Sequence, residues 1–204
     1  MQFGLPDLDL SPGDHVCAMY FGTGQRDEFL VPYLRSGLRS GDKCICVLDV
    51  TDPGMLSVLG HGLDIDDALA SAQLEMSGAA DTYLSSGEFD ADEVLAFWET
   101  TMGTALASGD YAFVRAAGEM PKPLRILPGG IDAFMAYESE LNTYLAEHPE
   151  QSLLCMYDLE VFGGGLMLEL LRTHPRLLLG GLLLDNPHSL APEDYRTSHR
   201  VDPS

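Results

Sequence analysis

A glycine-containing turn follows the first apolar run of the chain and could bind an anion. The run His15–Tyr20 leads into Phe21-Gly22-Thr23-Gly24-Gln25-Arg26, after which helical spacing begins. This is the context of a Walker A loop, whose GxxxxGK[ST] pattern surrounds phosphate with backbone amides and a lysine. Here the Lys-Ser/Thr pair is missing, and Asp27 and Glu28 put negative charge where a triphosphate needs positive charge. ATP hydrolysis is therefore not expected, although Arg26 could neutralise a smaller anion.

Polar and aromatic side chains also follow the other predicted strands. In a mostly parallel sheet, ligands bind outside the carboxyl ends of the strands, where the loops leave toward the helices. This rule predicts one ligand-binding crevice, lined by Tyr20, Gly22, Gly24, Arg26, Asp49, Arg115, Glu119, Tyr157 and Asp158. Within it, Glu119 would orient a ligand or a water molecule, or would instead cap nearby backbone amides. For Arg115, pairing with a carboxylate such as Glu119, Asp158 or Glu169 is favoured over contact with an anionic ligand.

The histidines and cysteines raise the question of a metal site. Four cysteines (Cys17, Cys44, Cys46 and Cys155) lie in apolar runs without a CxxC spacing, which predicts buried reduced thiols. His15 and Cys17 alternate onto one face of a strand and are weak candidates for two of four zinc ligands. Because no second pair lies nearby in sequence, no metal and no cofactor are predicted. His174 precedes Pro175 at a helix end and is expected to bond the last free carbonyls.

The charge of the chain excludes several partners. It has 204 residues, with 32 acidic and 11 basic side chains and a formal net charge of -21. Such a surface repels nucleic-acid phosphates and anionic membranes, so no direct nucleic acid and no membrane partner is expected. No apolar run reaches the roughly 18 residues that span a bilayer, and the first ten residues do not read as a signal peptide, so a cytoplasmic location is expected.

The elements that must position these residues alternate between strands and helices. Apolar runs of strand length predict strands at His15–Tyr20, Lys43–Val50, Leu74–Met76, Tyr111–Ala116, Ser152–Tyr157 and Arg176–Leu184. Helical spacing predicts helices over Arg26–Ser40, near Pro53–Gly60, Asp64–Ser71, from Asp90 to about Leu106, around Ile131–Leu145 and over Phe162–Arg172. This order predicts an α/β fold of three layers, α/β/α, with a mostly parallel sheet flanked by helices on both faces. One domain over residues 1–190 is expected, followed by a polar tail, 191–204, whose last ten or so residues are frayed unless they dock on a partner.

Short motifs in a fixed order carry a family resemblance over nearly the whole chain. They are Gly13-Asp14-His15-Val16-Cys17-Ala18-Met19-Tyr20, then Leu38-Arg39-Ser40-Gly41-Asp42-Lys43-Cys44, Arg115-Ala116-Ala117-Gly118-Glu119-Met120, Tyr137-Glu138, Leu171-Arg172-Thr173-His174-Pro175 and Asn186-Pro187. This series resembles MEDS, the methanogen/methylotroph DcmR sensory domain. The chain departs from the pattern at Pro121-Lys122-Pro123, where many members have a polar residue and an aromatic.

The resemblance implies a RecA/KaiC-like fold with a degenerate phosphate loop and a sensory role without catalysis. Members are thought to sense small molecules such as hydrocarbon derivatives for DNA-binding or kinase modules, so an unknown small molecule and a signalling or regulatory protein partner are expected. A homodimer is possible. Two alternatives stay open: a nucleotide-binding or weakly hydrolytic relative of KaiC, and a scaffolding protein without a ligand.

Overall fold

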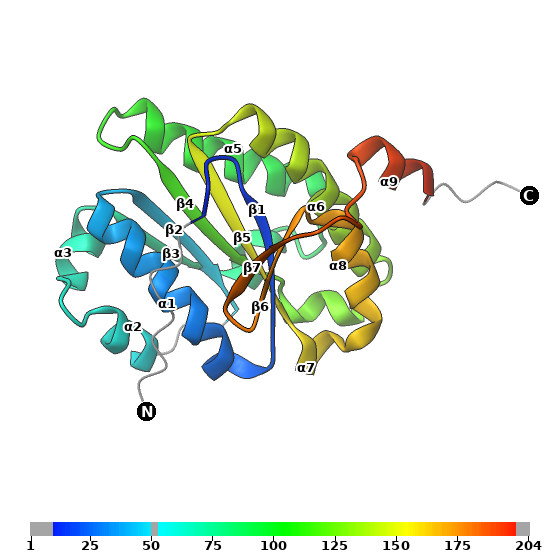
Figure 1. The fold of residues 1–204 in the computed structure, drawn as a ribbon, viewed down its shortest axis with the longest axis horizontal. Helices are drawn as coiled ribbons and strands as arrows, with labels where there is room; N and C mark the ends of the chain where they lie inside the picture. The colour runs from blue at the N-terminus through cyan, green and yellow to red at the C-terminus, as the bar shows by residue number, and fades with distance from the viewer. Residues whose placement is uncertain (1–9, 50–52, 199–204) are drawn as a thin grey trace, which may run out of the picture.

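The computed structural model describes residues 10–49 and 53–198 and forms one seven-stranded sheet around which the helices pack (Figure 1). The strand order is β3-β2-β4-β5-β1-β6-β7. Every neighbouring pair is parallel except β6 and β7, which are antiparallel. The strands are β1 His15–Tyr20, β2 Lys43–Leu48, β3 Leu74–Gly78, β4 Val114–Glu119, β5 Gln151–Asp158, β6 Arg176–Leu179 and β7 Leu182–Asp185. The three-layer α/β fold with a mostly parallel sheet is thereby confirmed.

Two groups of helices bury the two faces of this sheet, and each group has its own apolar core (Figure 1). One face is covered by α1 Gly22–Ser40, α2 Pro53–Leu59 and α3 Ile65–Ala70. The other is covered by α4 Ala79–Tyr83, α5 Ala91–Ala107, α6 Gly130–Glu147, α8 Met167–Thr173 and α9 Pro192–Ser198. Short elements complete the chain: η1 Lys122–Ile126, α7 Leu159–Phe162 and η2 Gly164–Leu166.

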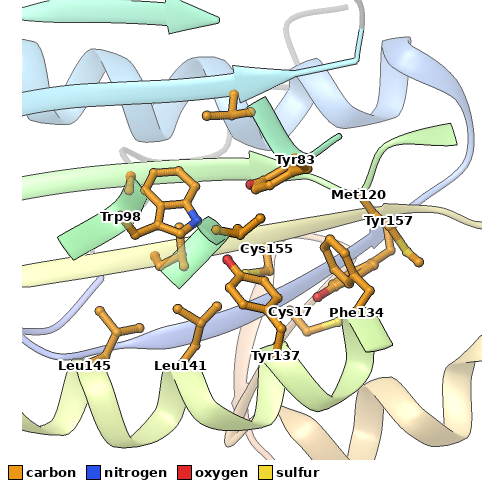
Figure 2. Packing of buried hydrophobic residues seen from close by; sticks show 14 of the residues in the cluster. Cys17, Tyr83, Trp98, Met120, Phe134, Tyr137, Leu141, Leu145, Cys155 and Tyr157 are labelled. Carbon is orange, nitrogen blue, oxygen red and sulfur yellow. The ribbon is translucent and has the colours of Figure 1, made fainter. Parts of the chain in front are cut away.

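Alternation along the strands divides their side chains between these cores. In β1, Val16, Ala18 and Tyr20 face α1, whereas Cys17 faces α6. Figure 2 shows Tyr137, Leu141 and Leu145 pointing from α6 toward the sheet, with Cys17 and Cys155 in the layer between them. The central strands are buried along their whole length, as expected for parallel strands with helices on both sides.

The glycine turn after β1 is much shorter than a phosphate-binding loop. β1 ends at Tyr20 and α1 begins at Gly22, so Phe21 is the only residue between them. We predicted the helix from Arg26, and the structure corrects its start by one turn. Gly22 has φ +71°, which allows the chain to reverse at once into the helix, and the Phe21 amide donates to Gln25 Oε1 at 2.7 Å. A loop this short has no backbone that could surround a phosphate.

The fourth strand lies three residues later in the chain than its sequence suggests. The prediction was Tyr111–Ala116, because Tyr111, Phe113 and Val114 favour a strand, but the observed strand is Val114–Glu119. Ala116, Ala117 and Gly118 form its middle, and at Gly118 a larger neighbour packs directly on the backbone: a Cβ added there would lie 2.3 Å from Tyr83 Oη. The shift places Glu119 at the carboxyl end of β4 and Arg115 near its amino end.

The apolar run at the end of the domain is a hairpin and not one strand. We predicted a single strand over Arg176–Leu184, but β6 and β7 pair through the turn Gly180-Gly181, where φ is +55° and +80°. Two successive residues with positive φ form the turn that best matches the twist of a hairpin. The helix predicted over Phe162–Arg172 is likewise interrupted, because Gly163 and the short turn η2, Gly164–Leu166, separate α7 from α8.

Part of the polar tail is ordered against the domain. Pro192–Ser198 forms α9, in which Tyr195 is buried and donates to Glu169 Oε2 at 3.0 Å, and Arg196 pairs with Glu140 at 3.0 Å. The expectation that the last ten or so residues are frayed was therefore wrong for residues 195–198, and 199–204 lie outside the described residues. In the described ranges, no helix is long and apolar enough to cross a bilayer.

Candidate functional site

Four of the predicted crevice residues meet at the carboxyl ends of β1, β2 and β4. Glu119 is buried, and its Oε1 accepts a hydrogen bond from the Tyr20 hydroxyl. Its Oε2 accepts from Arg26 Nη1 at 3.2 Å and from the Asp49 backbone amide at 2.7 Å. We call these four residues, Tyr20, Arg26, Asp49 and Glu119, the Glu119 network. Its interactions are made within the protein, so Glu119 holds three segments together.

The electrostatics of the Glu119 network oppose phosphate binding. The Arg26 guanidinium is fully buried and also pairs with Asp27 at 2.8 Å, so two carboxylates neutralise the buried cation of the turn. Burial by itself would lower the pKa of Arg26, but Glu119 and Asp27 outweigh it and raise the pKa. Burial, followed by the charge and hydrogen bond of Glu119, raises the pKa of Tyr20, which stays a neutral donor. Lys122 pairs with Asp49 at 3.2 Å.

The remaining predicted residues near the turn have local roles. Asp158 caps α7, since its Oδ1 accepts from the Glu160 amide at 3.0 Å, and it also accepts from the Gly22 amide at 3.4 Å. Gly24 is exposed, and a Cβ added there would have no atom within 4 Å. Neither glycine amide forms part of a phosphate cradle.

Two predicted crevice residues lie elsewhere, and the structure corrects them. Arg115 is near the amino end of β4, where its Nε donates to Asp42 Oδ2 at 2.6 Å. The expected pairing with a carboxylate is present, but the partner, Asp42, lies at the amino ends of the strands, whereas Glu119 lies at their carboxyl ends. Tyr157 is fully buried and points toward α6, on the face away from Tyr20, because successive residues of a strand alternate between faces (Figure 2).

A cavity of about 680 Å³ opens beside the turn, between α1, α7 and the β6–β7 hairpin. We call it the hairpin cavity. Its walls are mostly apolar, with Gln25 and Glu28 as the polar members, and the full set is Met19, Phe21, Gln25, Glu28, Phe29, Leu159, Met167, Leu178, Leu179, Gly180 and Gly181. A pocket of this size and composition suits a small, mainly apolar molecule. Sequence reasoning predicted a crevice at these strand ends but missed the part of the cavity wall that the hairpin forms, because the hairpin was predicted as one strand.

A buried polar cluster lies on the other face of the sheet. His15 Nε2 is 3.1 Å from Glu138 Oε2 and 3.3 Å from Cys155 Sγ, and His174 Nε2 is 3.3 Å from the same Glu138 oxygen. The Tyr157 hydroxyl lies 3.1 Å from His174 Nε2. The weak metal candidate His15 belongs to this cluster, but Cys155, which pairs with Cys17 across the β1–β5 ladder, takes the place that we gave to Cys17.

Burial and mutual contacts perturb the pKa values in this cluster. Burial would raise the pKa of Glu138, but hydrogen-bond contacts with the rings of His15 and His174 outweigh it and lower the pKa to about 2. Burial lowers the pKa of His174, which favours the neutral ring. Burial and the charge of Glu138 raise the pKa of the Cys155 thiol. The predicted bond of His174 to a helix carbonyl is present, from Nδ1 to Leu170 O at 3.1 Å.

The motifs that hold both sites match a described family. The model of the MEthanogen/methylotroph, DcmR Sensory domain matches residues 14–175. The chain belongs to the MEDS family. This MEDS chain is also 30% identical over 171 residues to the transcriptional repressor DcmR of Methylorubrum extorquens, covering 82% of the chain and 60% of the repressor. The chain therefore spans less than two thirds of the length of that relative. The family and the relative together indicate a sensory, regulatory role.

Solved structures share the fold of this MEDS domain at low sequence identity. A KaiC-like protein from Pyrococcus horikoshii is 14% identical, with a TM-score of 0.51 over 81% of this chain and 70% of that one. An uncharacterized P. horikoshii protein in complex with an unknown peptide is 10% identical, with a TM-score of 0.60 over 85% and 82%. The flagellar accessory protein FlaH of Methanocaldococcus jannaschii is 13% identical, with a TM-score of 0.51 over 85% and 76%. These likenesses confirm the RecA/KaiC-like fold.

Proposed function

We propose that this MEDS domain is a non-catalytic sensor that binds a small, mainly apolar molecule in the hairpin cavity. The observation that supports the proposal is the cavity itself, which opens at the carboxyl ends of the strands, where folds of this kind bind ligands. The Glu119 network argues against phosphate binding. No lysine follows the glycine turn, and Arg26, the arginine next to it, is already paired with Asp27 and Glu119. The family resemblance makes hydrocarbon derivatives the first class of ligand to test.

A bound molecule would act through the hairpin that walls the cavity. Leu179, Gly180 and Gly181 line the cavity, and the same hairpin continues into β7, whose Leu182 and Leu184 are exposed. β7 is the edge strand of the sheet, and an edge with exposed apolar side chains is suited to pairing with another polypeptide. Ligand binding would shift the conformational equilibrium of the hairpin, and a regulatory partner protein bound to β7 would respond to this shift. The longer repressor relative is a precedent for such a regulatory context.

Binding is tested on the full chain with a matched pair of variants. Native mass spectrometry of the purified protein looks for a retained small molecule, and thermal shift measurements screen short-chain alcohols, haloalkanes and small aromatic hydrocarbons. Met167→Trp narrows the cavity, whereas Leu168→Trp adds the same side chain to an exposed neighbour outside it. We expect ligands to stabilise the wild type and Leu168→Trp but not Met167→Trp.

Two results would contradict the proposal. One is a screen in which no compound stabilises the protein, or in which Met167→Trp responds as Leu168→Trp does. The other is micromolar binding of ATP with magnesium accompanied by turnover, which would favour the nucleotide-binding alternative suggested by the KaiC-like fold. Leu182→Lys tests whether β7 is the surface that a partner binds. This change should weaken association with a partner or second copy, measured by sedimentation, without changing the thermal shift that a ligand produces.

A further inference from the structure

The buried polar cluster brings four potential metal ligands together from distant parts of the chain. His15 comes from β1, Glu138 from α6, Cys155 from β5, and His174 directly follows α8. We call these four residues the His-Glu-Cys cluster. All four are buried, and one ligand atom from each lies within 4.8 Å of all the others. Figure 2 shows the position of Cys155 between α6 and the sheet, with Tyr157 nearby.

The tautomer of His15 follows from its outer hydrogen bond. Its Nδ1 lies 2.8 Å from Asn142 Oδ1. The Asn142 amide nitrogen donates to the backbone oxygens of Thr173 at 2.7 Å and Ser139 at 3.2 Å, so the Asn142 oxygen must face His15. An oxygen of this kind only accepts, and His15 Nδ1 therefore carries the proton. In the neutral ring, Nε2 then directs a lone pair at Glu138 and Cys155.

The same reasoning applies to His174. Its Nδ1 donates to Leu170 O at 3.1 Å, and it lies 2.9 Å from the Thr173 hydroxyl, which donates to Glu169 O at 3.0 Å. Both neighbours are acceptors toward the ring, so the proton is again on Nδ1 and the Nε2 lone pair faces inward. Metal-binding histidines are commonly oriented in this way, by a carbonyl or amide oxygen on the outer nitrogen.

Three acceptor atoms consequently face one another in a buried space. The two Nε2 atoms lie 3.1 Å and 3.3 Å from Glu138 Oε2, the Cys155 sulfur lies 3.3 Å from His15 Nε2, and the Tyr157 hydroxyl lies 3.1 Å from His174 Nε2. A metal ion placed among these atoms would bind the lone pairs of both rings and the carboxylate at once. Metal–ligand bonds of about 2.0–2.3 Å in a tetrahedral zinc site place neighbouring ligand atoms roughly 3.3–3.7 Å apart. Three of the six separations are 3.1–3.3 Å and the others are within 4.8 Å, so side-chain movements of about 1 Å would bring the four atoms to this geometry.

We propose that the His-Glu-Cys cluster binds one divalent transition-metal ion, with Zn²⁺ as the ion that two imidazoles, a carboxylate and a thiolate fit best. On binding, the Cys155 thiol releases its proton to solvent, and the thiolate and the Glu138 carboxylate balance the charge of the ion. Four protein ligands fill the coordination shell, so the ion is structural and ties β1, β5, α6 and the end of α8 together. A cavity of about 310 Å³ lies against His15 and Asn142, on the outer side of the cluster. This site is independent of the hairpin cavity.

The metal itself is the probe in the first experiment. The full chain is purified without chelators, its metal content is measured by mass spectrometry of the elements, and the stripped protein is titrated with Zn²⁺ against a chromophoric chelator. We expect one ion per chain and submicromolar affinity. Substitution with Co²⁺ should give the intense visible bands of a tetrahedral site and a near-ultraviolet thiolate-to-cobalt band. In urea at a concentration that partly unfolds the stripped wild-type protein, Zn²⁺ should also protect Cys155 from alkylation, a readout that needs no variant.

Matched variants identify the ligands. Cys155→Ser should abolish the thiolate-to-cobalt band and weaken Zn²⁺ binding at least 100-fold, whereas Cys46→Ser, a buried thiol on the other face of the sheet, should change neither. Asn142→Ala, which removes the outer hydrogen bond of His15 together with the bonds to the Ser139 and Thr173 carbonyls, should weaken binding roughly 10- to 100-fold. Absence of one-to-one binding of Zn²⁺ and Co²⁺ at micromolar concentration would overturn the proposal in favour of a charged hydrogen-bonded cluster. A thiolate band that survives in Cys155→Ser, or the absence of zinc protection of Cys155, would overturn it as well.

Discussion

Replacing Glu119 by alanine tests whether the Glu119 network stabilises the fold. The change removes one carboxylate from the fully buried Arg26 guanidinium, which keeps Asp27, and it takes the side-chain acceptor away from the Asp49 amide. Removing one partner of a buried ion pair costs about 3–5 kcal/mol, and Asp27 at 2.8 Å moderates that loss. An unsatisfied buried amide adds about 1–3 kcal/mol. We therefore expect Glu119→Ala to lower the free energy of unfolding by about 3–5 kcal/mol, or Tm by roughly 6–20 °C for a chain of this size.

The assay is urea unfolding followed by the fluorescence of Trp98, the single tryptophan, which is fully buried. Glu28→Ala, at an exposed position of the same helix as Arg26, is the control and should stay within about 0.5 kcal/mol of wild type. Arg26→Met combined with Glu119→Ala should cost less than the sum of the single changes by at least about 1 kcal/mol, because the double variant removes both charges of the pair. A loss below about 1 kcal/mol for Glu119→Ala, or strict additivity, would refute the structural role and make Glu119 a candidate ligand-binding residue again.

Three further predictions concern packing, backbone conformation and thiol reactivity. Gly118→Ala should destabilise the protein by about 1–3 kcal/mol, because its new Cβ would lie 2.3 Å from Tyr83 Oη. The control Gly103→Ala, whose Cβ would have no atom within 4 Å, should be neutral or stabilise α5 by up to about 1 kcal/mol. Equal unfolding midpoints for the two variants would contradict this. Gly181→Ala should cost about 1–2 kcal/mol in the same assay, since φ is +80° there, and an unchanged midpoint would argue against the hairpin turn. All four cysteines are buried, and burial raises the pKa of Cys44 to about 12. The thiols therefore stay protonated and should react with Ellman's reagent only after unfolding. Rapid labelling of the native protein would contradict their burial.

Much of the architecture is readable from local patterns. The first strand, His15–Tyr20, has the bounds that its apolar run predicts, and the Asp90 cap of α5 is present, with Oδ1 accepting from the amides of Asp92 and Glu93. The absence of a lysine after the glycine turn already argues against a working phosphate site. These features depend on residues that are close together in the chain, where spacing and residue type are sufficient evidence.

The placement of strand ends was less accessible, because it depends on neighbouring strands. The β-favouring residues Tyr111 and Phe113 lie before β4, while Gly118, one residue before its end, makes room for Tyr83 and Trp98. Because of this shift of three residues, Arg115 lies near the amino ends of the strands and not in the predicted crevice at their carboxyl ends. Similarly, only the pairing of β6 with β7 distinguishes two short strands from one long one, and that pairing creates the wall of the hairpin cavity.

The amino-acid sequence by itself determined the α/β class, the family and the loss of the phosphate-binding lysine, since each is recorded in residue types at short spacing. The tertiary structure alone decided which side chains meet. His15 reaches Glu138 and Cys155 across 123 and 140 residues, and Tyr20 reaches Glu119 across 99. Contacts over such separations arise from strand order and from the alternation of faces along each strand, and neither leaves a local signal in the chain.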